Sequence, residues 1–407
     1  VGKVDITPPI GTPLNGYGSR LGKSSIGVHD PLWARVLYLD DGTTKFFLVN
    51  LDLCIVNPEL RARVLELAPA DVPHENIALT ATHTHNGAGG MVENIFFRSV
   101  SGRFMPEVLE QTSQKIAEAM RAALAAKRRA AVGFGVTEQK NLSKNRRYDN
   151  GPHDPQIGVL RVEDADGNPI AIVTNFDAHP TSIDDEGDNA FDFSADYPGY
   201  YYAEVERLEA PGCMAMFLNG AEGNQTNTDP DGKGGWERVE DVGKFVATKA
   251  VELANTIECV EAKLHVGQTM AKLPPSIAAF QPKEVFLQTL EVDDLLMTFM
   301  PGEACVEIGL GLRERALARG YKAQFTVGLS NNYLMYFIPR EIYCRLDYES
   351  TSSFFGPGIA DWYYAQFGAL MTRGEMPPEQ PNPTPAETAE DRKSTRLNSS
   401  HITIPYA

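Results

Sequence analysis

Two histidines stand one residue apart in the stretch ATHTHNGAGG, residues 81–90. Side chains repeat every two residues along a strand, so His83 and His85 project from the same strand face. The strand-like run over residues 76–82 places both at a strand end, where α/β proteins commonly build their sites. Such a pair is often only a hydrogen-bonded structural feature. It indicates a metal site if further donors join it.

A third candidate donor is His179, which follows the strand-like run over residues 169–176 and precedes a proline that ends regular structure. A lone histidine at a strand end is more often structural than ligating, so this position also needs partners. The contexts of His29, His74, His153 and His265 are weaker, and we interpret these four as structural.

The elements that must position these residues alternate between strands and helices. Apolar runs predict strands over residues 34–40, 45–52, 76–82, 132–136, 157–162, 169–176, 284–292 and 295–300. Helical apolar spacing predicts helices over residues 58–68, 106–130, 237–257 and 303–320. We therefore predict an α/β fold in which mixed β-sheets are layered with α-helices, and we find no internal repeat.

Composition narrows the functional class. The formal net charge of −17 disfavours nucleic acid or an anionic membrane as a partner, because counterion release rewards basic surfaces. No apolar run approaches the roughly 20 residues that span a bilayer. We expect a soluble protein, secreted or periplasmic if a signal peptide precedes Val1. The five scattered cysteines contain no CxxC pair, so we expect neither a disulfide framework nor a cysteine zinc site.

The end of the chain differs in composition. Residues 375–407 begin as a proline-rich polar stretch that cannot bury enough apolar surface to order itself. We predict a single domain over residues 1–374 followed by this tail. The final residues, which include His401, resemble translated adapter read-through at the ends of environmental gene fragments, and we exclude them from functional reasoning.

Eight segments carry a family resemblance when they are taken in order. They are residues 4–20, 83–90, 177–182, 194–204, 217–225, 299–309, 328–337 and 348–358. In this order they resemble the catalytic domain of the neutral, non-lysosomal ceramidases, from near Val1 to about Gly358. No single segment is specific, but the ordered set is.

The resemblance implies a zinc site. His83 and His179 would be the imidazole ligands, Glu303 would supply a carboxylate, and Tyr336 would approach the metal through its phenol oxygen. This mixed nitrogen and oxygen set suits zinc and leaves a position for water or substrate. His85 would face the substrate or support a ligand. Considered singly, Glu303 also fits a helix N-terminal carboxylate, and Tyr336 a half-buried core aromatic.

Three features depart from the family pattern. The serine segment of ceramidases corresponds here to GNQTNT, residues 223–228, where Thr226 stands at the serine position and Asn224 replaces an aspartate. Glu222, just before it, is a carboxylate that the family segment lacks. Ceramidases also continue into a further β-sandwich domain. The third departure is an acidic loop after His179 that holds Asp184, Asp185, Glu186, Asp188, Asp192 and Asp196.

Three functions remain open on these grounds. An acidic loop suits hydroxyl groups better than acyl chains, so we favour an exo-glycosidase on a small polar sugar. Zinc would chelate vicinal hydroxyls, and Glu222 or Asp196 would act as acid and base. The alternative is hydrolysis of an N-acyl amide, with Thr226 in place of the serine and Tyr336 or His85 stabilising the oxyanion. The last is a zinc-containing binding protein without turnover.

Overall fold

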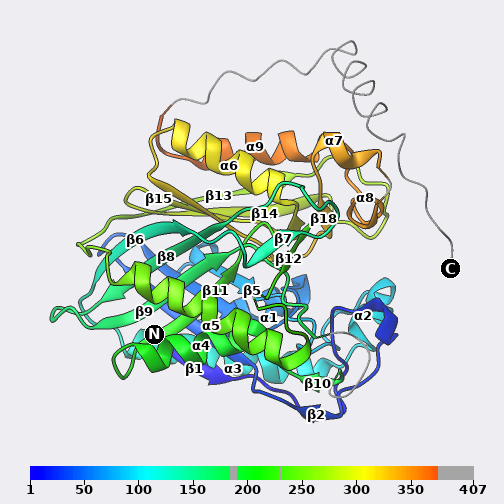
Figure 1. The fold of residues 1–407 in the computed structure, drawn as a ribbon, viewed down its shortest axis with the longest axis horizontal. Helices are drawn as coiled ribbons and strands as arrows, with labels where there is room; N and C mark the ends of the chain where they lie inside the picture. The colour runs from blue at the N-terminus through cyan, green and yellow to red at the C-terminus, as the bar shows by residue number, and fades with distance from the viewer. Residues whose placement is uncertain (184–189, 230, 346, 375–407) are drawn as a thin grey trace. The chain divides into compact units, whose positions relative to one another are not determined.

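The computed structural model describes residues 1–183, 190–229, 231–345 and 347–374. Three four-stranded sheets form its framework (Figure 1). In spatial order the first contains β1 (Gly2–Asp5), β3 (Trp33–Asp40), β4 (Lys45–Leu51) and β5 (Ile77–Ala81). The second contains β11 (Met214–Asn219), β9 (Pro169–Phe176), β8 (Gln156–Glu163) and β6 (Ala131–Glu138). The third contains β13 (Leu264–Lys272), β14 (Glu284–Val292), β15 (Leu295–Phe299) and β17 (Ala323–Val327).

Each sheet contains one parallel strand pair at one of its edges. The pairs are β4 with β5, β9 with β11, and β15 with β17. A parallel pair requires a crossover connection, and a helix provides it each time. These helices are α1 (Pro58–Leu67), α4 (Tyr197–Leu208) and α6 (Val306–Ala318). The fold therefore contains three βαβ units, and the loops after both strands of a unit leave from the same end.

The edge strands β5, β11 and β17 meet one another through their C-terminal loops. The Asn219 side chain after β11 donates to the Thr82 carbonyl after β5, at 3.0 Å. The Gly328 amide after β17 donates to the Asn219 carbonyl at 2.9 Å, and the Asn331 amide donates to the Leu79 carbonyl at 2.8 Å. These bonds join three sheet edges that would otherwise present unpaired backbone groups.

The inner faces of the three sheets share one hydrophobic core, in which Phe46, Val173 and Met297 are fully buried. Helices cover the outer faces (Figure 1). α1 and α3 (Pro106–Ala125) pack with the first sheet, α4 and α5 (Gly235–Ala254) with the second, and α6 and α9 (Ile359–Leu370) with the third. The sheet-and-helix layering confirms the α/β prediction.

Short elements complete the described chain. Three two-stranded sheets pair β2 (Gly27–Val28) with β10 (Asp192–Phe193), β7 (Ser143–Asn145) with β12 (Gln225–Asn227), and β16 (Glu303–Ala304) with β18 (Tyr336–Phe337). The short helices are α2 (Arg98–Ser101), α7 (Arg340–Tyr343) and α8 (Tyr348–Thr351), with 3-10 turns at Gly18–Arg20, His74–Asn76 and Ile95–Phe97.

The predicted strands are all present, and so are the four predicted helices, although the limits of each helix differ from the predicted ones. The helix expected over residues 106–130 ends at Ala125, and the chain then turns toward strand β6. The helix expected from Glu303 begins at Val306, because Glu303 and Ala304 pair with Tyr336 and Phe337 as short parallel strands. This difference matters for the site, since pairing rather than a helix sets the position of Glu303.

Residues Val1–Gly374 form one structural unit, and Glu375–Ala407 form the other. The second unit, with the predicted tail and His401, lies outside the described residues, as do Asp184, Asp185, Glu186 and Asp188 of the acidic loop. None of the helices in the described residues is both long enough and apolar enough to span a membrane.

The close packing of α5 on α4 depends on a glycine. A β-carbon built at Gly243 would lie 2.6 Å from both the Tyr197 carbonyl oxygen and Tyr200 Cβ. We predict that Gly243→Ala lowers the free energy of unfolding by about 1–3 kcal/mol, because overpacking outweighs the gain in helix propensity. Urea denaturation measures this change. Gly234→Ala, where a β-carbon meets nothing within 4 Å, is the control and should lower it by less than about 1 kcal/mol, because Gly234 is the N-cap of α5 and alanine is a poorer N-cap than glycine. Equal effects at both positions would contradict the packing argument.

Candidate metal centre

His83 follows strand β5 and is almost fully buried, with 1% of its surface exposed. Its backbone has a φ of 72°, a left-handed conformation that is uncommon outside glycine. Its ring nitrogen Nδ1 lies 2.7 Å from the carbonyl oxygen of Cys54, which follows the neighbouring parallel strand β4. When Nδ1 donates this hydrogen bond, Nε2 keeps its lone pair and faces Glu303 Oε2 at 3.4 Å.

His179 is held in the same way from the second sheet. It follows strand β9, and its Nδ1 lies 2.8 Å from the Glu222 carbonyl oxygen and 3.0 Å from that of Gln225. Its Nε2 faces Glu303 Oε2 at 3.1 Å. A ring anchored through one nitrogen to a backbone carbonyl, with the other nitrogen free, is the usual support of a metal-binding histidine.

Glu303 follows strand β15 of the third sheet and lies in the short strand β16. The pairing of β16 with β18 aligns it with Tyr336, and its Oε1 accepts a hydrogen bond from the Tyr333 hydroxyl at 2.6 Å. Ligand atoms of His83, His179 and Glu303 all lie within 4.8 Å of one another, so this buried group can hold a metal ion. His83, His179 and Glu303 thus meet at one place, which the sequence alone could not establish.

Within this group the negative charge of Glu303 and the positive charge of His83 stabilise each other. Burial opposes the carboxylate charge, but His83 and His179 hold the pKa of Glu303 well below its usual range. Burial also opposes the imidazolium, yet Cys54 and Glu303 raise the pKa of His83 well above its ordinary value. The pKa of His179 falls to about 3, because of burial and the nearby Arg146 cation.

Arg146 and Tyr333 are site residues that the sequence interpretation missed. Arg146 Nη2 donates to the Tyr336 hydroxyl oxygen at 3.1 Å and to the Gly223 carbonyl at 2.7 Å. Its Nε donates to Glu349, which is 1% exposed, at 2.8 Å. Tyr333 shares the segment that holds Tyr336, so its motif offered a signal. Nothing in the local sequence singles out Arg146.

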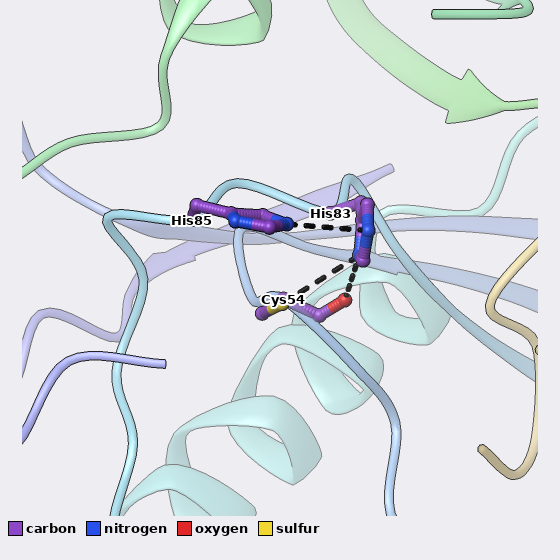
Figure 2. A group of neighbouring side chains, drawn as sticks. All are labelled: Cys54, His83 and His85. Atoms are coloured by element: carbon purple, nitrogen blue, oxygen red, sulfur yellow. Dashed lines mark hydrogen bonds between the residues drawn. The ribbon is translucent and has the colours of Figure 1, made fainter. Parts of the chain in front are cut away.

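His85 lies beside the metal-binding group. Its Nε2 is 3.4 Å from His83 Nε2, and Figure 2 shows the two rings meeting edge to face. The group that His85 joins contains Cys54 and His83, without His179 or Glu303. Burial and the neighbouring His83 and His179 lower the pKa of His85 well below its usual value, so its ring is neutral.

Glu222 is fully buried, and neither carboxylate oxygen has a hydrogen-bond partner among the described residues. Burial raises its pKa well above the ordinary value, which His83 opposes and Glu303 reinforces. Thr226 forms a β-bridge with His179, and its hydroxyl makes a long 3.5 Å contact with the Asn227 carbonyl.

The carboxylate of Asp196 accepts hydrogen bonds that hold neighbouring segments of the backbone in place. It accepts from the Ser182 amide at 3.0 Å, the Ser182 hydroxyl at 2.7 Å and the Tyr197 amide at 2.6 Å. The last contact caps the N-terminus of α4. These bonds tie the end of the acidic loop to the segment that follows His179.

Metal content tests the three-residue group directly. We predict that His83→Ala and His179→Ala lose most of the bound zinc, of which about one ion per chain is expected, because each removes one of few donors. Elemental analysis of purified protein measures the ratio, and circular dichroism verifies folding. His265→Ala, on an exposed strand position, is the control. Full occupancy in both folded variants would contradict the ligand assignment.

Proton release gives a second test. Because the pKa of His83 is raised in the metal-free protein, its proton competes with a metal ion at neutral pH. We predict that zinc affinity increases as pH rises toward that pKa and then levels off. Calorimetry in two buffers of different ionisation enthalpy at pH 7 should detect about one proton released per ion from His83. Zinc binding without proton release would contradict the protonated state of His83.

Comparisons with known proteins agree with this architecture. The sequence model of the family described as "Neutral/alkaline non-lysosomal ceramidase, N-terminal" matches residues 1–213. The neutral ceramidase of Pseudomonas aeruginosa is 28% identical over 283 residues, which are 62% of this chain and 41% of that protein. Neutral ceramidase A of Dictyostelium discoideum is 25% identical over 255 residues, 57% of this chain and 36% of that protein. The chain thus aligns with less than half of each relative's length.

The fold also matches solved structures. The neutral ceramidase of Pseudomonas aeruginosa superposes with a TM-score of 0.80 at 21% identity, over 93% of this chain and 76% of that one. A structure titled "Ceramidase complexed with C2" gives 0.78 at 22% identity, over 94% and 76%. The family match ends at residue 213, but the structural match extends beyond it, into the part of the chain that contains Glu303 and Tyr336. With more than half of its sequence matched by the family model, the chain belongs to the neutral/alkaline non-lysosomal ceramidase family.

Proposed function

We propose that the protein is a zinc-dependent amidase that hydrolyses an N-acyl amide, with His83, His179, Glu303 and Tyr336 as the zinc ligands. The observation that carries this proposal is the convergence of two imidazole Nε2 atoms and one carboxylate, from three different sheets, in a chain of the ceramidase family. Membership of that family favours the amide bond over the glycosidic bond that the acidic loop suggested.

The residues fit zinc in chemistry as well as in position. Zinc takes nitrogen and oxygen donors, and catalytic zinc sites keep a position open for water or substrate, which beside four protein ligands requires five-coordination. Both histidines have Nδ1 within hydrogen-bonding distance of backbone carbonyls, so Nε2 faces the centre. Tyr336 is aligned with Glu303 by strand pairing, which supports it as the fourth ligand. When bound, zinc would act as a Lewis acid on the acyl carbonyl and supply hydroxide at neutral pH.

The remaining roles follow from hydrogen-bonding capacity and charge. The neutral ring of His85 keeps one N–H that can donate to the oxygen on which negative charge develops. Arg146 adds a fixed cation beside Tyr336 and holds the loop after Glu222 through the Gly223 carbonyl. The hydroxyl of Thr226, which has only a long internal contact, remains available to the substrate in place of the family serine.

The two acidic residues have different expected roles. Burial raises the pKa of Glu222 and so favours its protonated form, which suits proton donation better than proton abstraction. Its burial among the metal-site residues also means that a charged carboxylate would add a second negative charge beside Glu303. Asp196 holds the start of α4 and the segment after His179, so we assign it a positioning role.

A substrate panel tests the proposal. We predict that the protein releases free acid from N-acyl amides, that a chelator abolishes the release and that zinc restores it. Glu303→Gln should reduce the rate by at least about 100-fold, because it removes a ligand, whereas His265→Ala should retain it. Liquid chromatography of the products measures both rates.

Chromogenic glycosides form the second arm of the same panel. Chelator-sensitive release from glycosides alone would overturn the amidase proposal in favour of the glycosidase. A fully zinc-loaded protein that hydrolyses neither class would overturn it in favour of a binding protein.

A further inference from the structure

The thiol of Cys54 lies near Nδ1 of His83, whereas the group of His83, His179 and Glu303 takes the Nε2 atom of that ring. Cys54 is 3% exposed, and its Sγ lies 3.6 Å from His83 Nδ1. His83 Nε2 also faces His85 Nε2 at 3.4 Å, and Cys54 and His85 lie on the same side of the His83 ring (Figure 2). Figure 2 shows the thiol and both imidazoles as neighbours. One ligand atom from each residue lies within 4.8 Å of the other two.

We propose that Cys54, His83 and His85 form a second metal site, selective for a thiophilic divalent cation such as Cd²⁺, that shares His83 with the Glu303 group. The sharing makes the two sites mutually exclusive. A thiophilic cation would therefore compete with zinc for the protein without using His179 or Glu303.

The donor set supports a soft cation. Thiolate ligands favour thiophilic cations, and the preference grows with the softness of the cation, whereas the two imidazoles and the carboxylate of the other group offer no soft donor. The 3.6 Å separation of Sγ and Nδ1 also fits two ligands of one ion. With the bond lengths of zinc, about 2.3 Å to sulfur and about 2.0–2.1 Å to nitrogen, a tetrahedral ion places these atoms about 3.6 Å apart, and the larger cadmium ion requires a slightly wider separation.

Mutual exclusion follows from the chemistry of the shared ring. A neutral imidazole has one nitrogen without a proton, so His83 can give one lone pair to one cation at a time. Binding the soft cation forms a bond to Cys54 Sγ, breaks the S–H bond and sends the proton to solvent. The hydrogen bond between His83 Nδ1 and the Cys54 carbonyl favours the Nε2 lone pair, and hence the zinc site, until such a cation competes.

The two groups differ by residues that can be changed separately. His85 and Cys54 belong only to the thiophilic group, His179 and Glu303 only to the zinc group, and His83 to both. The site depends on the loop after β4, which carries Cys54, lying beside the loop after its parallel neighbour β5, which carries His83 and His85.

Cadmium titration of the metal-free, full-length protein tests the proposal. Cadmium bound to a thiolate gives an ultraviolet charge-transfer band that nitrogen and oxygen ligands do not give. The parent for this experiment carries Cys259→Ser and Cys344→Ser, because these thiols are the part-buried and the exposed ones. We expect about one thiolate-bound cadmium per chain in this parent, and its loss in Cys54→Ser.

Paired histidine variants separate the two groups. His179→Ala should keep the band, while His85→Ala should weaken cadmium affinity by at least about 10-fold. Zinc loaded beforehand should suppress the band, and cadmium should displace zinc as the band appears. Circular dichroism verifies folding of each variant, and metal content is measured without any hydrolysis assay, so failure of the amidase proposal is a separate result.

Three outcomes would overturn the proposal. They are a missing band in the parent, a band of full height in Cys54→Ser, and a full band while zinc stays bound. A band that disappears in folded His179→Ala but not in His85→Ala would likewise show that cadmium uses the other group.

Discussion

The geometry of the site depends on one constraint, which is that parallel strands need a crossover connection and so end on the same side. Three such pairs, β4–β5, β9–β11 and β15–β17, stand at the edges of three sheets, and their C-terminal loops are joined by backbone hydrogen bonds. The loop after each pair's strands then supplies a donor: His83 from the first, His179 from the second and Glu303 from the third. Residues more than two hundred positions apart meet because the three crossovers place them at a common end.

Electrostatics in this dry interior explain which groups carry charge. Two imidazoles face Glu303 and lower its pKa, whereas burial raises the pKa of Glu222, whose carboxyl group has no hydrogen-bond partner among the described residues. Arg146 remains a cation because Glu349 accepts from it, although burial opposes its charge. In this low-dielectric interior an unpaired charge is costly. A paired charge interacts more strongly there than in water with a metal ion or a charged substrate group.

The departures from the family pattern now have places in the fold. Thr226 and Glu222 lie on the segment that holds His179, so the altered serine segment also supports a metal donor. Asp196, which the acidic loop offered as a catalytic acid or base, instead caps a helix. The free thiol of Cys54 adds a donor of different softness to His83. One imidazole thus lies between two sets of donors, and its hydrogen bond to a carbonyl favours one of them.

The sequence alone could predict the α/β class, most strands and helices, and the chemical types of the donors, because periodicity and residue type are local properties. It could also indicate the family, since ordered motifs persist when overall identity is low. It could not show that Asp196 caps a helix, that Glu303 begins a short strand, or that Arg146 reaches Tyr336, because each depends on a partner distant in the chain. Only the tertiary structure decided which donors converge and which face of His83 meets the thiol, since strand pairing and loop packing fix those distances.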